Sequence, residues 1–153
     1  MRKTCLLTLT ITFTLPVATV AQNPSTAATR LVVMPADGLK WADLDPSVPG
    51  SKVVDLWGSH ASGAFGALFR LPAGFAAPLH THSYDMKVVI LSGTYIQAPE
   101  GKPEFRLGPG SYFMQPGGDY RHITRCDQAS DCVFFVESQG TFDLKLAEAG
   151  RKP

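Results

Sequence analysis

Glycine and proline divide this chain into many short segments. The 153 residues include 14 Gly and 12 Pro, which recur at short intervals. Turn-forming stretches at 45–50, 58–63, 72–74, 92–93, 108–110 and 116–118 leave mostly short runs between them. Because strands need fewer residues than helices, this spacing predicts an all-β fold of short strands joined by tight turns.

The β-rich runs between these turns are the predicted strands. Roughly eight to ten such runs at regular spacing favour a closed barrel or a two-sheet sandwich. Tyr120–Arg125 and Cys132–Glu137 are expected to form a hairpin, and only Phe142–Ala149 could be helical. The other predicted strands are Leu31–Pro35, Lys52–Trp57, Ala64–Leu71, Met86–Leu91, Thr94–Gln97, Glu104–Leu107 and Ser111–Gln115.

Length and charge indicate a single domain that does not bind nucleic acid. The chain is long enough for one domain with a sizeable core, and 44% of its residues are apolar. The formal charge of +1 becomes −1 without Arg2 and Lys3, which leaves 12 basic and 13 acidic residues. No basic cluster remains, so nucleic acid is not an expected partner.

The first 21 residues have the pattern of a secretory signal peptide. Arg2 and Lys3 precede the apolar stretch Cys5–Val17, and Thr19–Ala21 offers small or short residues for cleavage. The alternative is a membrane anchor, but the stretch is shorter than the ~20 residues that a spanning helix needs. A cleaved signal is therefore preferred, and stable membrane insertion is not expected.

This interpretation predicts a periplasmic or secreted protein with a simple domain order. Residues 1–21 are the signal peptide, 22–29 a flexible tether, and 30–150 a single β-barrel domain. In an oxidising compartment, Cys126 and Cys132 can form a disulfide across the polar loop 127–131. The alternative is two free thiols at a metal, but a five-residue gap is not a zinc-knuckle spacing.

His80 and His82 are the first candidates for chemistry. Residues two apart on a strand project from the same face, so the pair can chelate a transition metal. Pro78 disfavours a helix at this point and supports the strand. Two exposed polar residues on a strand would give the same pattern, so the pair alone is weak support for a metal site.

The surrounding residues make the pattern more specific. Gly74, five residues, His80-Thr81-His82, three residues, Met86, six residues and Gly93 form a first motif. Gly110, five residues, Pro116-Gly117-Gly118 and then His122 form a second. Together they resemble the two motifs of the cupin superfamily, and the flanking residues look most like cupins related to the anti-sigma factor ChrR. The resemblance implies a double-stranded β-helix, or jelly-roll, barrel.

Two positions depart from the cupin pattern. Met86 occupies the place of the usual glutamate ligand, and Arg121 occupies the place of the second-motif histidine, one residue before His122. A β-bulge after Gly118 would restore the inward direction of the His122 side chain. Asp85 has the wrong strand parity to replace the glutamate.

The resemblance implies one divalent transition metal (Fe, Zn, Ni, Mn or Cu) bound by His80, His82 and His122. Met86 and Gln115 are candidates for a fourth metal position or for the cavity wall, and for Met86 simple packing is preferred. Tyr84, Tyr95 and Tyr112 are weaker pocket candidates, and His60 is expected at the surface.

The sequence therefore predicts an exported cupin that acts on a small organic molecule, with a non-haem metal dioxygenase as the enzyme hypothesis. The alternative is a non-catalytic cupin that binds or senses a small molecule or a metal, or a barrel that has lost its metal. A homodimer is compatible with this fold, but the sequence does not define it. Fold alone does not select among these functions.

Overall fold

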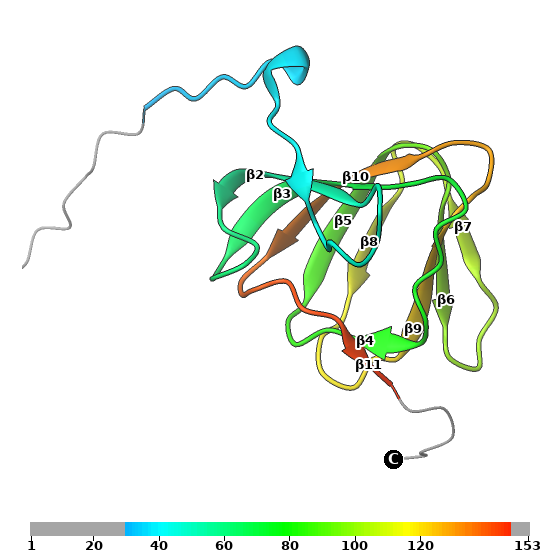
Figure 1. Cartoon of the computed structure of the whole chain (residues 1–153). Coiled ribbons are helices and arrows are strands. Elements are labelled where there is room, and N and C mark those ends of the chain that lie inside the picture. The colour runs from blue at the N-terminus through cyan, green and yellow to red at the C-terminus, as the bar shows by residue number, and fades with distance from the viewer. Residues whose placement is uncertain (1–29, 148–153) are drawn as a thin grey trace, which may run out of the picture. The chain divides into compact units, whose positions relative to one another are not determined.

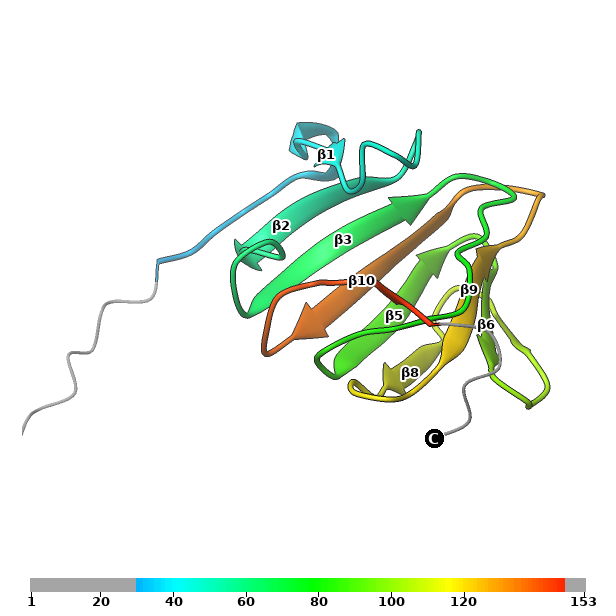
Figure 2. The same cartoon turned by 60° about the horizontal axis from the view of Figure 1, so that its bottom comes forward.

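Two β-sheets form the body of the protein. The structure, a computed structural model, describes residues 30–147, so the predicted signal peptide and tether lie outside the described residues. The two sheets are facing layers (Figures 1 and 2). A single short 3-10 turn, η1 (Ala36–Gly38), precedes them, and the described residues contain no α-helix.

The larger sheet has six strands in the order β1-β2-β3-β10-β5-β8, and all neighbours are antiparallel. Its strands are β1 (Ala42–Asp43), β2 (Lys52–Gly58), β3 (Phe65–Leu71), β10 (Cys132–Ser138), β5 (Met86–Ser92) and β8 (Tyr112–Gln115). The smaller sheet has five strands in the order β11-β4-β9-β6-β7, also antiparallel. Its strands are β11 (Lys145–Leu146), β4 (His80–Thr81), β9 (His122–Cys126), β6 (Tyr95–Pro99) and β7 (Phe105–Leu107).

The all-β prediction is confirmed, and eight of the nine predicted strands are present with small shifts at their ends. The strand predicted at Leu31–Pro35 is absent. No sheet edge pairs with this apolar run, and Leu31 is 89% exposed. The predicted helix at Phe142–Ala149 was also wrong over its described part. There, β11 pairs with β4, which draws the chain into an extended form.

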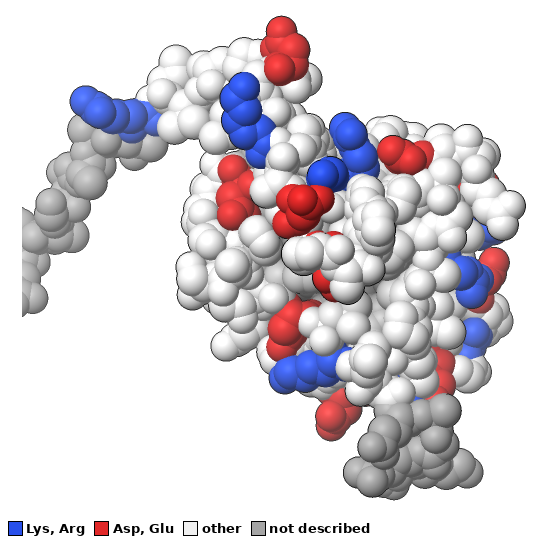
Figure 3. Space-filling model, viewed as in Figure 1, with Lys and Arg blue, Asp and Glu red and all other residues white. Residues whose placement is uncertain are grey.

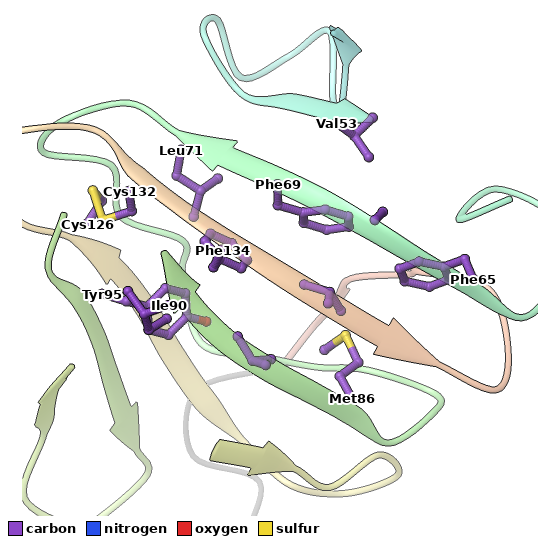
Figure 4. Packing of buried hydrophobic residues seen from close by; sticks show 13 residues of the cluster. Val53, Phe65, Phe69, Leu71, Met86, Ile90, Tyr95, Cys126, Cys132 and Phe134 are labelled. Atoms are coloured by element: carbon purple, nitrogen blue, oxygen red, sulfur yellow. A yellow bond between two sulfur atoms is a disulfide. The ribbon is translucent and has the colours of Figure 1, made fainter. Parts of the chain in front are cut away.

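The predicted hairpin of β9 and β10 does not form. Cys126 pairs with Tyr95 in the smaller sheet, whereas Cys132 pairs with Leu71 in the larger one. The loop 127–131 therefore crosses from one sheet to the other. Strand β9 cannot pair with β10, because β3 and β5 occupy both edges of β10. The Cys126–Cys132 disulfide is present, and it links the two sheets at this crossing (Figure 4).

The core lies between the sheets, and the two inner faces differ in chemistry. Strands β3, β5 and β10 alternate buried and more exposed residues, and they place Phe69, Ile90 and Phe134 inside (Figure 4). The inner face of the smaller sheet carries polar side chains instead, including His80, His122, Thr124 and Gln97, all buried. Buried polar groups need partners, so this inner face marks the place to look for a site.

The outer surface carries charges of both signs. On the face shown in Figure 3, Lys and Arg are interspersed with Asp and Glu among many uncharged residues. Ion pairs such as Lys87–Glu137, at 2.9 Å, join neighbouring strands. In the described part of the chain, no helix has the length and apolar character needed to cross a membrane.

Candidate metal centre

His80, His82 and His122 meet inside the barrel. His80 lies on β4, His82 follows that strand directly, and His122 begins β9 as the pairing partner of His80. The three rings lie 4.2–5.2 Å apart between centroids, and each side chain is buried. One ring nitrogen from each histidine lies within 4.8 Å of the others. The structure therefore brings all three predicted ligands together.

Backbone carbonyls fix the direction of each ring. Nδ1 of His80 lies 2.7 Å from the Pro78 carbonyl oxygen, and Nδ1 of His122 lies 3.3 Å from that of Tyr120. Nδ1 of His82 contacts the Asp143 carbonyl oxygen. A carbonyl only accepts hydrogen bonds, so each Nδ1 carries the proton and each Nε2 keeps its lone pair. In known metal sites, a ligating histidine usually donates its other ring N–H to a carbonyl or carboxylate, and this arrangement matches that pattern.

The free nitrogen of His122 has the surroundings of a ligand atom. Its Nε2 is buried and has no hydrogen-bond partner among residues 30–147. A buried polar atom without a partner is costly, and a metal ion would remove that cost. The residues present therefore fit a transition metal.

Burial also keeps these histidines neutral. It lowers the pKa of His80, and it lowers the pKa of His82 to about 4. The pKa of His122 falls to about 3, mainly through burial and also through its neighbour His80. Metals bind the neutral imidazole, so at neutral pH the site does not have to release protons before binding.

The extra residue before His122 is taken up by a loop. Pairing between β9 and β6 is continuous from Cys126 to His122, so the predicted bulge is absent from this strand. The loop 116–121 is held instead by hydrogen bonds from Gly118 N to the His82 carbonyl oxygen (2.8 Å) and from Gly117 N to Asp85 Oδ1 (2.7 Å). Asp85 thus anchors the loop and lies outside the histidine cluster.

Met86 and Gln115 lie beside the histidines. They are pairing partners on β5 and β8, they are 6% and 2% exposed, and they line the same cavity as His80 and His82. This cavity measures about 110 Å³. Its wall is mostly apolar, with Phe69, Phe134 and Val136 among its members.

The weaker predictions for the tyrosines and for His60 have different outcomes. Tyr95 lines the cavity, whereas Tyr84 and Tyr112 are exposed at the surface. His60 is not a surface residue as expected. It is half-buried because Asp55 accepts a hydrogen bond from its ring at 2.9 Å and the rings of Phe65 and Phe69 pack beside it.

Sequence reasoning missed the contribution of segment 139–147. Asp143 supplies the carbonyl for His82, and its carboxylate accepts hydrogen bonds from Ser83 N (2.7 Å) and Oγ (2.6 Å). The Phe142 ring lies 5.4 Å from that of His82 and lines the cavity. These contacts require an extended segment, so they could not be predicted while a helix was considered for Phe142–Ala149.

The family of the chain is shown by a match to a known family. The model of a family described as a domain of unknown function, DUF4437, matches residues 17–145. The chain belongs to the DUF4437 family. No curated protein matches this DUF4437 chain.

Solved structures show that this DUF4437 protein has a cupin fold. An RmlC-like cupin from Ralstonia eutropha JMP134 has a TM-score of 0.60 at 17% identity, over 80% of this chain and 76% of its own. The polyketide cyclase RemF from Streptomyces resistomycificus has a TM-score of 0.63 at 16% identity, over 82% and 89%. The DMSP lyase DddQ from Ruegeria pomeroyi DSS-3 has 0.58 at 22%, over 76% and 64%. These likenesses concern the fold alone.

The close approach at Gly117 generates a first prediction. A Cβ at Gly117 would lie 2.6 Å from the Tyr84 carbonyl carbon and 2.7 Å from the Ser83 carbonyl oxygen. We expect Gly117→Ala to push these residues, and with them His82, out of place. The free energy of unfolding should fall by about 1–3 kcal/mol, and metal affinity should fall with it.

Gly108→Ala is the matched control, because nothing lies within 4 Å of a Cβ there. Both variants are compared by urea unfolding and by metal titration. If Gly117→Ala matches Gly108→Ala in both measurements, the loop does not position His82.

Met86 generates a second prediction. Glu at this position would add a charged oxygen ligand to three neutral nitrogens, so we expect Met86→Glu to fold and to bind metal more tightly. Met86→Leu is the control, since it keeps the volume and adds no ligand. The measurement is a thermal melt of both variants with and without added metal. If Met86 only packs the core, the unpaired carboxylate should cost about 3 kcal/mol or more, and metal should restore nothing.

Proposed function

We propose that this protein is a metal-dependent cupin that acts on a small organic molecule. His80, His82 and His122 would hold one divalent transition metal: iron, zinc, nickel, manganese or copper. The observation that carries the proposal is a set of three buried imidazoles. Their Nδ1 atoms face carbonyls, and one ring nitrogen of each lies within 4.8 Å of the others.

We propose a dioxygenase-type reaction as the enzyme activity. A metal held by His80, His82 and His122 would supply Lewis-acid and redox chemistry to a substrate in the cavity. The cavity wall of Phe69, Phe134 and Phe142 would orient an apolar substrate and exclude water. Segment 139–147 would keep His82 in the correct tautomer through the Asp143 carbonyl.

The side chains around the cavity support chemistry at a metal more than chemistry by a side-chain base. Burial raises the pKa of Tyr95 to about 12, and its hydroxyl is bonded to Thr124 Oγ1 at 3.0 Å. The Asp45 carboxylate faces solvent and accepts hydrogen bonds from Ser47. Among the described residues that line the cavity, no other carboxylate is present.

A non-catalytic binding or sensing cupin is the second candidate. The observation that favours it is Met86, which replaces the carboxylate of the cupin pattern with a thioether. Dioxygen uptake by the iron-loaded protein with candidate substrates separates the two. Uptake that follows substrate supports the enzyme, and tight binding without uptake supports the sensor.

The metal site generates a third prediction. His80→Ala and His82→Ala should each lower metal affinity by more than the roughly 10–100-fold that loss of an outer-sphere partner costs. Elemental analysis of purified protein gives the metal content of each variant. His60→Ala is the matched control, since His60 lies outside the cluster. Full occupancy in both cluster variants would contradict the assignment.

Export to the periplasm or medium is a further part of the proposal. The pattern of residues 1–21 supports it, and so does the Cys126–Cys132 disulfide, because structural disulfides persist in oxidising compartments. In a bacterial host, the exported protein should begin at Gln22 and show no free thiol before reduction. Mass spectrometry with thiol alkylation measures both. A chain that keeps residues 1–21, or two alkylated cysteines, would count against export.

A further inference from the structure

Two buried glutamines meet between the sheets. Gln97 lies on β6 of the smaller sheet and Gln115 on β8 of the larger one, and they are 5% and 2% exposed. Nε2 of Gln97 donates a hydrogen bond to Oε1 of Gln115 at 3.2 Å. The contact therefore spans the interior of the barrel. Gln97 had no distinguishing signal in the sequence, and Gln115 was expected as a candidate for a fourth metal position or for the cavity wall.

This amide pair has unused hydrogen-bonding capacity. Oε1 of Gln97 and Nε2 of Gln115 are buried and have no partner in the part of the chain that the structure describes. Turning both amides by half a turn only exchanges which residue offers the donor, so one donor and one acceptor remain in either orientation. The neighbouring pair of Tyr95 and Thr124 differs, because its two hydroxyls are bonded to each other at 3.0 Å. Buried polar atoms without partners are uncommon and call for a reason.

The amide pair lies next to the histidine cluster. Gln115 lines the cavity together with His80 and His82. Gln97 is the pairing partner of Thr124, two residues along β9 from His122. A molecule in the cavity could therefore meet His80, His82 and the Gln115 amide at once, with Gln97 behind Gln115 as its hydrogen-bond partner.

We infer that this amide pair binds a hydroxyl group of the substrate through Gln115, and that the substrate is a small alcohol or phenol. The inference rests on the proposed function and names its substrate class. A hydroxyl both donates and accepts, so it satisfies the Gln115 amide in either orientation of the pair. Both amides are neutral, and no Lys or Arg is among the described residues that line the cavity, so in the metal-free protein a charged group would lack a counter-ion there.

The size and lining of the cavity favour a single ring. Its volume of about 110 Å³ approaches the ~150 Å³ of an apolar cavity that takes up benzene. The rings of Phe69, Phe134 and Phe142 border it and offer edge or face contacts to an aromatic ligand. Phenol is therefore the simplest probe.

The test compares phenol with toluene, which has the same shape without the hydroxyl, and with benzoate, which is charged. Binding is measured by calorimetry in metal-free protein, and phenol and toluene are also compared in zinc-loaded protein, where the cation would attract the benzoate carboxylate. We expect the metal-free wild-type protein to bind phenol at least about tenfold more tightly than either analogue, as for a site built to hydrogen-bond a ligand. In Gln97→Met/Gln115→Met, and in Gln115→Met alone, this preference should disappear.

The melting temperature distinguishes recognition from a structural role. Replacing both under-used amides with side chains of similar shape should leave the melting temperature of the ligand-free protein unchanged or raise it. Gln128→Met is the control, since Gln128 is exposed, and it should keep the preference for phenol. A fall in melting temperature with the preference intact would overturn the inference, and so would a wild-type protein that does not prefer phenol.

The result is independent of the metal. Loss of phenol selectivity in the amide variants of metal-free protein supports the inference even if no metal binds, and the proposed function would then fail alone. Normal metal binding with no phenol preference would overturn the inference and leave the proposed function standing.

Discussion

Backbone pairing on both sides of β4 holds the candidate centre together. This strand has only two residues, yet His80 pairs with His122 of β9 on one side and with Leu146 of β11 on the other. Ala147 N also donates to the Leu79 carbonyl oxygen at 2.9 Å. The candidate ligands His80 and His82 therefore depend on a strand that cannot be stable alone, and both β9 and the chain after β10 must be in place.

The inner faces of the two sheets have different chemistry. The larger sheet supplies the apolar wall, with Phe69, Ile90 and Phe134 packed together. The smaller sheet supplies the buried polar side chains. Some of them have partners within the protein, as Tyr95 and Thr124 do, whereas Nε2 of His122 and Oε1 of Gln97 have none among the described residues. The Cys126–Cys132 disulfide adds a covalent link between the sheets at one crossing.

Much of this could be predicted from the sequence, because the relevant signals are local. Strand positions follow from Gly and Pro spacing, and the direction of His80 and His82 follows from strand parity. Contacts between distant segments could not be predicted in this way. The role of Asp143 depends on β11 pairing with β4, and the crossing at 127–131 depends on β10 having β3 and β5 as neighbours. The partnership of Gln97 with Gln115 depends on the distance between the two sheets, which no short motif encodes.

If His80, His82 and His122 bind one metal ion through Nε2, the metal must see three imidazole rings. X-ray absorption at the metal edge of protein isolated with its native metal measures this. We expect scattering from three imidazole rings, with metal–nitrogen distances of about 2.0–2.1 Å if the metal is zinc, and only light atoms as other neighbours. A spectrum with fewer than three rings, or protein that holds no metal in its native compartment, would contradict it.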